Sequence, residues 1–401
     1  MNTCKGPLAG VRVLDITAVL MGPYATQMLG DMGADVIKVE SPEGDTVRDI
    51  GPRRNHGMAG IFLQANRNKR SIVLDLKQPE GREALLRLAA DVDVLVYNVR
   101  PQAMARLGLD YAAVAAVNPT IIYVGVYGYG QAGPYAAKPA YDDLIQGAVG
   151  LPALTLAAGA DTPRYVPSAM ADRIVGMSAV SAITAALYHR QCSGEGQSIE
   201  IPMFETMAQF VLGDHLGGLS FDPPQGPSGY ARLLNEHRKP YPTLDGFLCV
   251  MIYSDKQWRS FFELIGRGDE FDTDERLGSI GRRTEHIHEL YRMVAGIIAT
   301  GTSAEWLERL EAADIPVMPM HTVESLLEDP HLQAVGFFDY QEHPSEGRIR
   351  SLGIPSTWSA TQPTLTRHAP RLGEHSAQIL AAAGYTPEQI NTLATRGITR
   401  L

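Results

Sequence analysis

The N-terminal third of the chain alternates short β-branched runs with helical stretches, and this rhythm constrains the fold more than any other feature. The apolar runs lie at 11–17, 35–40, 71–76, 93–99 and 120–128. The intervening segments 23–33 and 79–92 each open near a proline, and the first closes with a glycine, as helices do. Strands that alternate with helices predict parallel β-α-β units with right-handed crossovers. We therefore expect an α/β fold built on a parallel sheet.

A second, smaller unit is predicted in the C-terminal half. The segment 221–230 concentrates proline and glycine after a helical stretch, which indicates a linker with a boundary near residue 225. Beyond it, Thr302 and Glu305 match the S/T-x-x-E capping pattern and predict a helix over 303–313. The unit is expected to end around 329–333. The length of 401 residues allows a large domain plus a smaller one.

Charge and cysteine content exclude several classes of protein. The formal net charge of -10 and the isoelectric point near 5.6 argue against a general nucleic-acid or anionic-membrane binder. Cys4, Cys192 and Cys249 form no CxxC pair, so neither a disulfide framework nor a thiolate zinc site is indicated. The chain shows no signal-peptide pattern and no uninterrupted apolar run near the roughly 20 residues that span a bilayer. We expect a cytoplasmic protein.

The common nucleotide and hydrolase motifs are missing. The first strand-to-helix junction, residues 16–30, contains no G-x-G-x-x-G, so a nicotinamide dehydrogenase is unsupported. The sequence also lacks a Walker A motif, H-E-x-x-H and G-x-S-x-G. These absences remove the commonest ATPase, zinc-protease and α/β-hydrolase hypotheses.

A basic stretch between Arg48 and Lys77 is a local anomaly in an acidic chain. Its bases are Arg48, Arg53, Arg54, Arg67, Lys69, Arg70 and Lys77. At the carboxyl ends of parallel strands such groups are well placed for ligand phosphates. A solvated charged loop is the alternative. Asn98, Arg100 and Arg106 follow the run 93–99 and extend the same edge, where an ordinary polar loop is again the alternative.

Asp172 is the single acid in residues 168–190, and it falls at the first turn of a predicted helix whose many small side chains allow close packing on all sides. One interpretation is an N-cap aspartate that accepts backbone N–H bonds. The other is a nucleophile, because the positive helix end favours an ionised carboxylate at neutral pH, and a carboxylate can attack an acyl carbon. The two interpretations are compatible.

Several separate stretches, taken in order, resemble the family III coenzyme A transferases over nearly the whole chain. The matching stretches are GVRVLDIT and residues 22–48, 66–77, 93–101, 128–142, 171–205 and 372–376. The resemblance implies a Rossmann-like large domain of residues 1–224 plus 331–401, completed by the C-terminal segment. It also implies a smaller inserted α+β domain of residues 225–330 and two chains threaded through each other as an interlocked homodimer.

The resemblance further implies an activity and its residues. CoA moves from a donor acyl-CoA to an acceptor carboxylic acid, and Asp172 forms an acyl anhydride and then an aspartyl-CoA thioester. The residues expected along bound CoA are Leu74, Lys77, Asn98, Val99, Arg100, Arg106, Lys138 and Tyr141. CoA or acyl-CoA is the expected substrate, with no metal or nucleotide cofactor and no nucleic-acid or membrane partner.

Two other functions remain open. The α-methylacyl-CoA racemases of the same superfamily use a histidine in a G-H-D-I-N-Y stretch, which here reads A-Y-D-D-L, with Tyr141 in the place of the histidine. A phenol loses its proton around pH 10 and is a poor base near neutrality. A non-catalytic acyl-CoA binder is favoured only if Asp172 is buried, caps a helix and lies out of reach of a thioester.

Departures from the family pattern bear on specificity. Leu20 and Met21 replace the Gln-Ala pair of formyl-CoA transferases, and Ser41 stands where a base can contact the nucleotide. The apolar pair suits a bulkier or less polar acyl group, although simple packing explains it equally well.

Overall fold

The computed structural model describes residues 6–401, and the chain forms two compact units. The sheet unit comprises the described residues up to Val149, Val166–Gln209 and His331–Leu401, and the small unit comprises Gly150–Tyr165 and Phe210–Pro330. The small unit ends at Pro330. It starts at Phe210 rather than at 225, because the helix before the proline-rich segment already crosses the division, and it also takes up Gly150–Tyr165.

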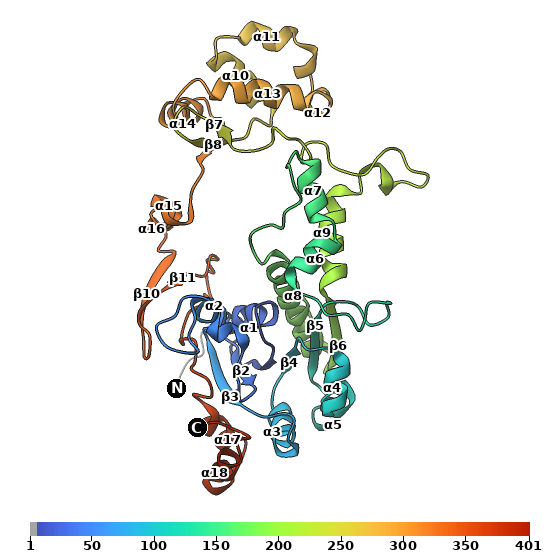
Figure 1. Ribbon diagram of the computed structural model, residues 1–401, viewed down its shortest axis with the longest axis vertical. Helices are drawn as coiled ribbons and strands as arrows, with labels where there is room; N and C mark the ends of the chain where they lie inside the picture. Colours follow the sequence, from blue (N-terminus) through green and yellow to red (C-terminus); the bar gives the residue numbers. More distant parts are fainter. Residues whose placement is uncertain (1–5) are drawn as a thin grey trace. The chain divides into compact units, whose positions relative to one another are not determined.

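The sheet unit is built on a six-stranded parallel sheet of order β3-β2-β1-β4-β5-β6 (Figure 1). The strands are β1 (Arg12–Ile16), β2 (Asp35–Glu40), β3 (Lys69–Val73), β4 (Val94–Tyr97), β5 (Ile122–Tyr127) and β6 (Gln197–Pro202). The prediction of an α/β fold with a parallel sheet is confirmed. The order reverses between β1 and β4, which is the switch point of a doubly wound, Rossmann-type sheet.

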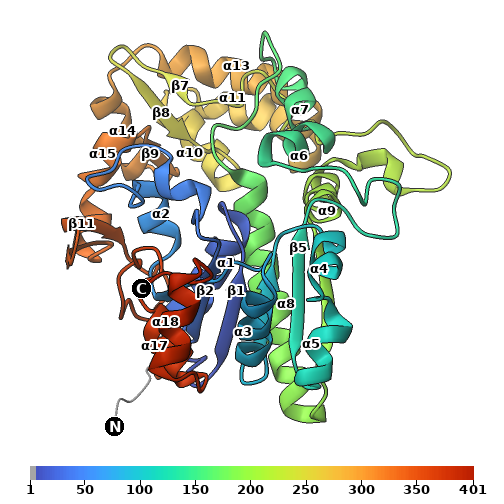
Figure 2. The ribbon, with the colours of Figure 1, turned by 60° about the horizontal axis from the view of Figure 1, so that its bottom comes forward.

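Helices cover both faces of this sheet (Figure 2). One face carries α3 (Pro79–Ala89), α4 (Pro101–Leu107), α5 (Tyr111–Val117), α17 (Ser376–Ala382) and α18 (Pro387–Thr395). The other face carries α1 (Met21–Asp31) and α8 (Met170–Ser193), which pack on each other. Neighbouring strand residues alternate between the faces. Leu14 packs against the first group of helices, and its neighbour Val13 points to the opposite face. Both side chains are fully buried, so the sheet is covered on both faces.

The C-terminal segment completes the sheet unit without adding a strand to the main sheet. It forms the hairpin β10 (Phe338–His343) and β11 (Gly347–Leu352) before α17. Along the outer edge of β3, the backbone N–H of His375 donates to Ser71 O at 2.9 Å, and Val73 N–H donates to Ser376 Oγ at 3.2 Å. These bonds satisfy an edge that is otherwise open to pairing with another chain.

The small unit combines a three-stranded antiparallel sheet with helices. Its elements are α7 (Leu151–Ala157), β7 (Tyr241–Pro242), β8 (Phe247–Val250), α10 (Asp255–Leu264), α11 (Gly268–Thr273), α12 (Ile280–Glu285), α13 (Ile287–Ile298), α14 (Ser303–Ala312), β9 (Val317–Pro319) and α15 (Val323–Leu327). The predicted capping box is confirmed, since Glu305 N–H donates to the Thr302 hydroxyl at 3.3 Å and Thr302 N–H donates to Glu305 Oε2 at 3.0 Å. The core forms around Trp258, Phe261 and Leu290.

Helices at the division and in the loops complete the chain. They are α2 (Gly60–Ala65), α6 (Asp142–Ala148), α9 (Met203–His215) and α16 (Pro330–Ala334), with the 3-10 turns η1 (Thr46–Asp49), η2 (Gly217–Ser220) and η3 (Glu275–Leu277). Cys192 and Cys249 are free and exposed, and Cys4 lies outside the described residues.

One helix, α8, has the length and composition of a membrane span, with a mean hydropathy of 1.3. A core helix of a water-soluble protein meets the same criterion, and α8 packs against α1, β5 and β6. The expectation that it packs on all sides is wrong for the single chain, because Met177 is 46% and Tyr188 is 73% exposed. Its small residues serve one buried face.

Candidate functional site

A cavity of about 440 Å³ opens at the carboxyl ends of β1, β2, β3 and β4. It spans the point where the strand order reverses, which is where open α/β sheets bind their ligands. Four of the eight residues predicted along CoA line it, namely Leu74, Lys77, Val99 and Arg106. Ser41, singled out in the sequence, lines it as well. A larger cavity of about 680 Å³ lies between residues 42–58 and the C-terminal segment, and its lining includes none of the eight.

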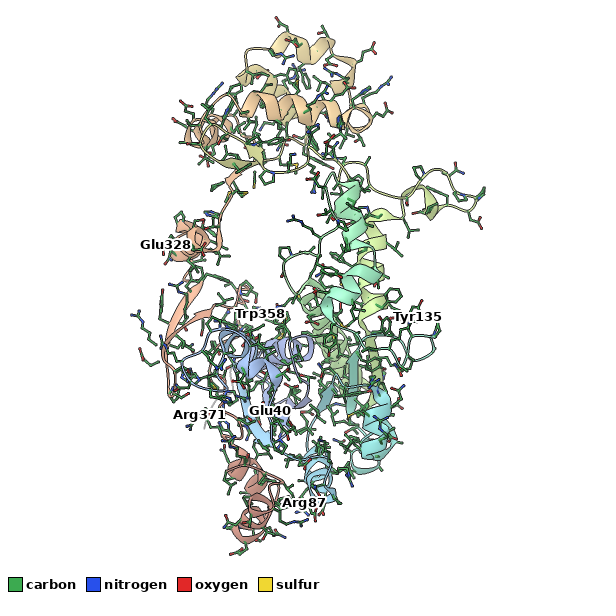
Figure 3. All side chains as sticks on the ribbon, in the orientation of Figure 1. Glu40, Arg87, Tyr135, Glu328, Trp358 and Arg371 are labelled. Carbon is green, nitrogen blue, oxygen red and sulfur yellow. The ribbon has the colours of Figure 1, made fainter. Side chains whose placement is uncertain are left out.

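The charge of the 440 Å³ cavity is dominated by exposed bases. Lys77 and Arg106 are exposed at its edge. Glu40 lies at the end of β2 (Figure 3) and forms an ion pair with Arg48, with Oε1 and Nη2 2.7 Å apart. Both side chains are almost fully buried. Asp45 is engaged in the same way by Lys38 at 2.9 Å. Two acids of the lining are therefore neutralised by buried bases. The third, Asp75, offsets one of the two exposed bases, so the lining keeps a small positive charge for a phosphate-bearing ligand.

Most of the basic stretch proves to be structural. Four bases pair with acids of the sheet or of α1: Arg48 with Glu40 (2.7 Å), Arg67 with Asp31 (2.7 Å), Lys69 with Asp15 (3.0 Å) and Arg70 with Asp35 (2.5 Å). A fifth, Arg53, forms an exposed pair with Asp49 at 3.6 Å. For the first four, both sequence interpretations, phosphate site and solvated loop, are wrong. Their partners come from β1, β2 and α1, so the pairs bind neighbouring elements together. Burial lowers the pKa of the Lys69 ammonium to about 8 even beside Asp15.

Asn98 holds the loop that follows β1. Its Oδ1 accepts the N–H of Ala18 at 3.0 Å, and its Nδ2 donates to Ala18 O at 2.7 Å. The next residue, Val19, has φ of 69°, which costs about 1 to 3 kcal/mol for a β-branched side chain. Asp45 Oδ1 accepts its N–H at 3.0 Å, and Lys38 Nζ donates to the preceding Thr17 O at 2.9 Å. Asn98 is thus a positioning residue beside the cavity wall.

The other three predicted CoA residues lie around the loop after β5. Arg100 Nη1 donates to Ala137 O at 3.2 Å, which joins the start of α4 to this loop. The Lys138 ammonium stands 3.7 Å from the ring centroid of Tyr135 (Figure 3). Tyr141 is 69% exposed and immediately precedes α6. These residues do not appear in the lining of the 440 Å³ cavity.

Asp172 lies in the first turn of α8 but does not cap it. The residue at the N-cap is Ala169, and the backbone N–H of Asp172 donates to Asp142 Oδ1 at 2.9 Å. The N-cap interpretation is therefore wrong. The second oxygen of Asp142 accepts from Gln146 Nε2 at 2.6 Å. Asp142, the first residue of α6, was not singled out from the sequence as a site residue, although it directly follows Tyr141.

The Asp172 carboxyl is half-buried and electrostatically perturbed. Burial, and after it the Asp142 carboxylate, raises its pKa to about 6, while Arg173 opposes the rise. The sequence argument expected the helix end to favour the ionised form, and the shift has the opposite direction because desolvation outweighs that partial charge. At pH 7 a pKa near 6 still leaves the carboxylate in about tenfold excess. Asp172 is therefore both ionised and unusually basic at neutral pH.

Close packing places Asp172 beside the start of α1. Gly176, one turn further along α8, lies so close to α1 that an added Cβ would meet Met21 O at 2.9 Å. The Arg173 guanidinium stacks 4.2 Å from the Tyr24 ring centroid. Leu20 and Met21 are 5% and 6% exposed, so both contribute to packing at this junction. The loop 17–19, which Asn98 holds by hydrogen bonds, leads directly into the start of α1 at this junction.

Comparisons with known proteins agree over most of the chain. The sequence profile of CoA-transferase family III matches residues 8–376. The succinate–glutarate CoA-transferase of Agrobacterium fabrum is 37% identical over 394 residues, which cover 95% of this chain and 96% of that protein. The human succinyl-CoA:glutarate CoA-transferase is 30% identical, covering 99% and 91%. A CaiB/BaiF family protein from Brucella suis has a structure with a TM-score of 0.79 and 32% identity, covering 94% and 100%.

Proposed function

Because the chain belongs to CoA-transferase family III and transfers CoA, we propose that it does so through covalent intermediates on Asp172. The observation that carries this proposal is the Asp172 carboxyl, which is half-buried, ionised at neutral pH and more basic than an ordinary aspartate. A carboxylate with this basicity is a better nucleophile toward an acyl carbon than a solvated one.

The first half of the reaction consumes the donor. One oxygen of Asp172 attacks the thioester carbon, the carbon–sulfur bond breaks, and the products are a mixed anhydride and the CoA thiolate. The thiolate then attacks the aspartyl carbonyl of the anhydride. The donor leaves as its free carboxylate, and Asp172 carries CoA as a thioester.

The second half repeats these steps with the acceptor. The acceptor carboxylate attacks the aspartyl thioester, which releases the CoA thiolate and forms a second anhydride. The thiolate attacks the acceptor's acyl carbon, yields the new acyl-CoA and returns Asp172 as a carboxylate. One thioester replaces another of similar energy, so the balance requires no ATP.

The CoA body provides the positioning. We place its nucleotide in the 440 Å³ cavity, with phosphates near Lys77 and Arg106, because the cavity lies at the switch point and its lining keeps a small positive charge. Holding both the thiolate and the acyl group makes each return step intramolecular, which can supply about 7 to 11 kcal/mol in favourable systems. Arg100, Lys138 and Tyr141 would meet the remainder of the carrier.

Asp142 tunes the nucleophile in this account. Its charge disfavours ionisation of Asp172 and so keeps that carboxylate basic. Its hydrogen bond with the Asp172 N–H fixes the first turn of α8 to α6, and the bond from Gln146, which also lies in α6, holds the Asp142 carboxylate in place. We regard Asp142 as a positioning residue, since nothing requires it to touch the reacting atoms.

Short dicarboxylic acids are the substrates that we propose. Two relatives that align over nearly their whole length are named for succinate or succinyl-CoA and glutarate. The chain would accordingly exchange CoA between two such acids. A panel of donor acyl-CoAs against mono- and dicarboxylic acids tests this, and a preference for monocarboxylic acceptors would contradict it.

We also propose a cytoplasmic interlocked homodimer. Apolar side chains exposed on the sheet unit support a partner surface, and they include Tyr141 (69%), Leu144 (51%), Met177 (46%) and Tyr188 (73%). Light scattering coupled to size exclusion would return twice the mass of 43.6 kDa, whereas a monomer would refute the proposal.

Racemisation is the weaker alternative. It needs a second base opposite the first, and a tyrosine occupies position 141. Incubation of an α-methylacyl-CoA in heavy water without an added acid separates the two reactions. Deuterium at the α-carbon would support racemisation, and its absence would support transfer alone.

The test of the transferase proposal compares Asp172→Asn with Asp143→Asn. Both replace an acid by an amide of the same size, and Asp143 is an exposed neighbour in α6. Asp172→Asn should abolish CoA exchange while CoA binding stays within a few fold, and Asp143→Asn should retain exchange. Full exchange by Asp172→Asn would remove the proposal.

A further inference from the structure

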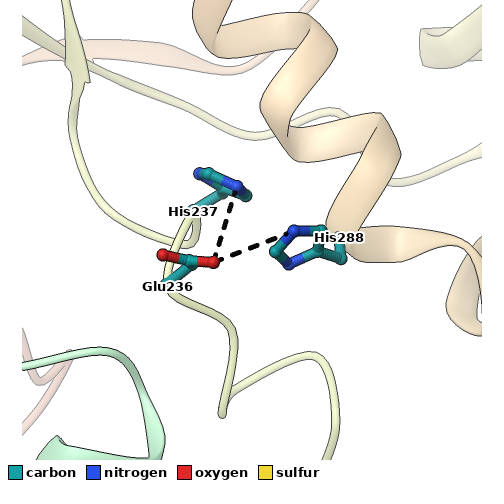
Figure 4. A group of neighbouring side chains, drawn as sticks. All are labelled: Glu236, His237 and His288. Carbon is teal, nitrogen blue, oxygen red and sulfur yellow. Dashed lines mark ion pairs between the residues drawn. The ribbon is translucent and has the colours of Figure 1, made fainter.

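A cluster of two imidazoles and one carboxylate lies in the small unit and includes none of the residues of the proposed CoA site. One ligand atom from each of Glu236, His237 and His288 falls within 4.8 Å of the others (Figure 4). Glu236 Oε1 is 3.9 Å from His237 Nε2 and 3.8 Å from His288 Nε2. The two rings have centroids 4.6 Å apart. Three lone-pair donors thus converge from two segments that are distant in sequence.

The backbone that presents these donors is fixed on both sides. Asn235, which is buried, accepts the N–H of His237 on its side chain at 2.9 Å and that of Arg238 on its carbonyl at 2.9 Å. His288 lies in the first turn of α13, between Ile287 and Leu290, which are buried in the core. The ligand-bearing tips are nevertheless partly exposed, with 55% exposure for Glu236, 19% for His237 and 52% for His288. The tips can therefore rotate while their anchors stay in place.

A third segment meets the same point. Gly159, with φ of 94°, lies so close that an added Cβ would approach Glu236 Cβ to 2.4 Å. The cluster consequently joins the stretch 150–165, the loop that carries Glu236 and the start of α13, all within the small unit. A ligand shared by the loop that carries Glu236 and the start of α13 would restrain the region that follows the proline-rich segment 221–230.

The donor set matches a borderline divalent cation. Two imidazole nitrogens with one carboxylate oxygen suit zinc and related first-row ions, whereas magnesium prefers oxygen alone. Ligands about 2.1 Å from a tetrahedral ion stand about 3.4 Å apart. The carboxylate lies 3.9 and 3.8 Å from the two imidazole nitrogens, and all three ligand atoms lie within 4.8 Å of one another, so rotation of the side chains has to close these gaps.

Neighbouring charges act on the site in both directions. Burial, and after it His288, Lys239 and Arg292, lowers the pKa of His237, while Glu236 opposes this effect. A lowered pKa favours the neutral imidazole, which is the form that binds a metal. The positive charges of Lys239 and Arg292 repel a cation, and the carboxylate of Glu236 offsets part of that repulsion.

We propose that Glu236, His237 and His288 form a binding site for one divalent ion of the zinc class, with water completing the coordination, and that the bound ion fastens the loop to α13. The site is independent of the chemistry at Asp172. Sequence analysis did not predict this site because no metal-binding spacing connects residue 237 with residue 288.

The experiment measures Zn²⁺ binding to the full-length protein after removal of metal with a chelator. Competition with a chromophoric chelator gives stoichiometry and affinity, and thermal unfolding with and without Zn²⁺ gives the effect on stability. The variants are His288→Ala and Glu236→Gln, which change exposed side chains. The matched control is His286→Ala, because His286 is an exposed imidazole near the same helix start but outside the cluster.

We expect one Zn²⁺ per chain and a raised unfolding temperature that Mg²⁺ does not reproduce. Loss of one ligand should weaken binding more than about tenfold in both variants. The control should bind as the native chain does. Absence of binding by the native chain overturns the proposal, as does equal binding by His288→Ala or an equal loss in His286→Ala.

Discussion

Replacement of Asp142 by asparagine isolates the electrostatic part of the proposed mechanism. The amide keeps one oxygen that accepts the Asp172 N–H, so the bond that anchors α8 to α6 survives. The negative charge and the acceptor for Gln146 Nε2 are both lost. Burial is the larger cause of the raised Asp172 pKa and the Asp142 charge is the second. The pKa should therefore fall from about 6 toward the ordinary value without reaching it, by on the order of one unit or less.

The assay is the pH dependence of kcat/KM for CoA exchange between pH 4.5 and 8. The native enzyme should lose activity as the pH falls through about 6, because protonated Asp172 is not a nucleophile. In Asp142→Asn this acid limb should move to lower pH. The plateau above pH 7 should fall, since a less basic carboxylate attacks more slowly.

The shift of the acid limb raises kcat/KM below the native pKa, whereas the lower basicity of the carboxylate reduces kcat/KM. General damage to the site would lower kcat/KM at every pH. Asp143→Asn, an exposed neighbour, is the control and should leave the limb in place. A limb that stays near 6 in Asp142→Asn, or that moves upward, would refute the electrostatic coupling. An equal shift in the control would do the same.

Four further outcomes follow from the structure. Asp172→Asn should stabilise the fold by up to about 3 kcal/mol at pH 7. The pKa of Asp172 is higher in the native state than in the unfolded state, so ionisation above the unfolded-state pKa destabilises the native state. Urea unfolding at pH 7 and pH 4 should show the gain only at the higher pH. Lys77→Ala should raise KM for acyl-CoA with kcat nearly unchanged, and an unchanged KM would count against the cavity as the CoA site. Asn98→Ala removes two hydrogen bonds to the loop after β1 and should cost about 1 to 3 kcal/mol in denaturant unfolding; a neutral change would show that the loop holds itself. Gly176→Ala should cost about 1 to 3 kcal/mol by pushing α8 from α1, whereas Gly296→Ala, which meets open space, should be neutral or stabilising.

The sheet was predictable because its strands are buried on both faces. Runs such as 120–128 are almost wholly apolar and lie between helices, which is typical of parallel sheets, and β5 covers Ile122–Tyr127 within this run. The strand β6 was not predicted, since Gln197, Ser198 and Glu200 interrupt its apolar residues. It is an edge strand with one neighbour, and edge strands tolerate such polar residues.

The candidate site was only partly predictable because its electrostatics depend on contacts between distant segments. Lys69 was predicted as a possible phosphate ligand, but it forms an ion pair with Asp15 of β1, and only the folded sheet brings these two residues together. The Asp142 charge beside Asp172 was not predicted for the same reason, because the packing of α6 on α8 brings the two residues together. A family resemblance predicted Asp172 as the nucleophile, whereas its raised pKa follows only from the three-dimensional contacts.

The most direct measurement locates the covalent intermediate. The protein is incubated with a donor acyl-CoA alone, treated with hydroxylamine or borohydride, digested and sequenced by mass spectrometry. The account predicts modification of the peptide that contains Asp172, at that side chain, and no modification when donor is omitted. An adduct on any other residue, or turnover without an adduct, would contradict it.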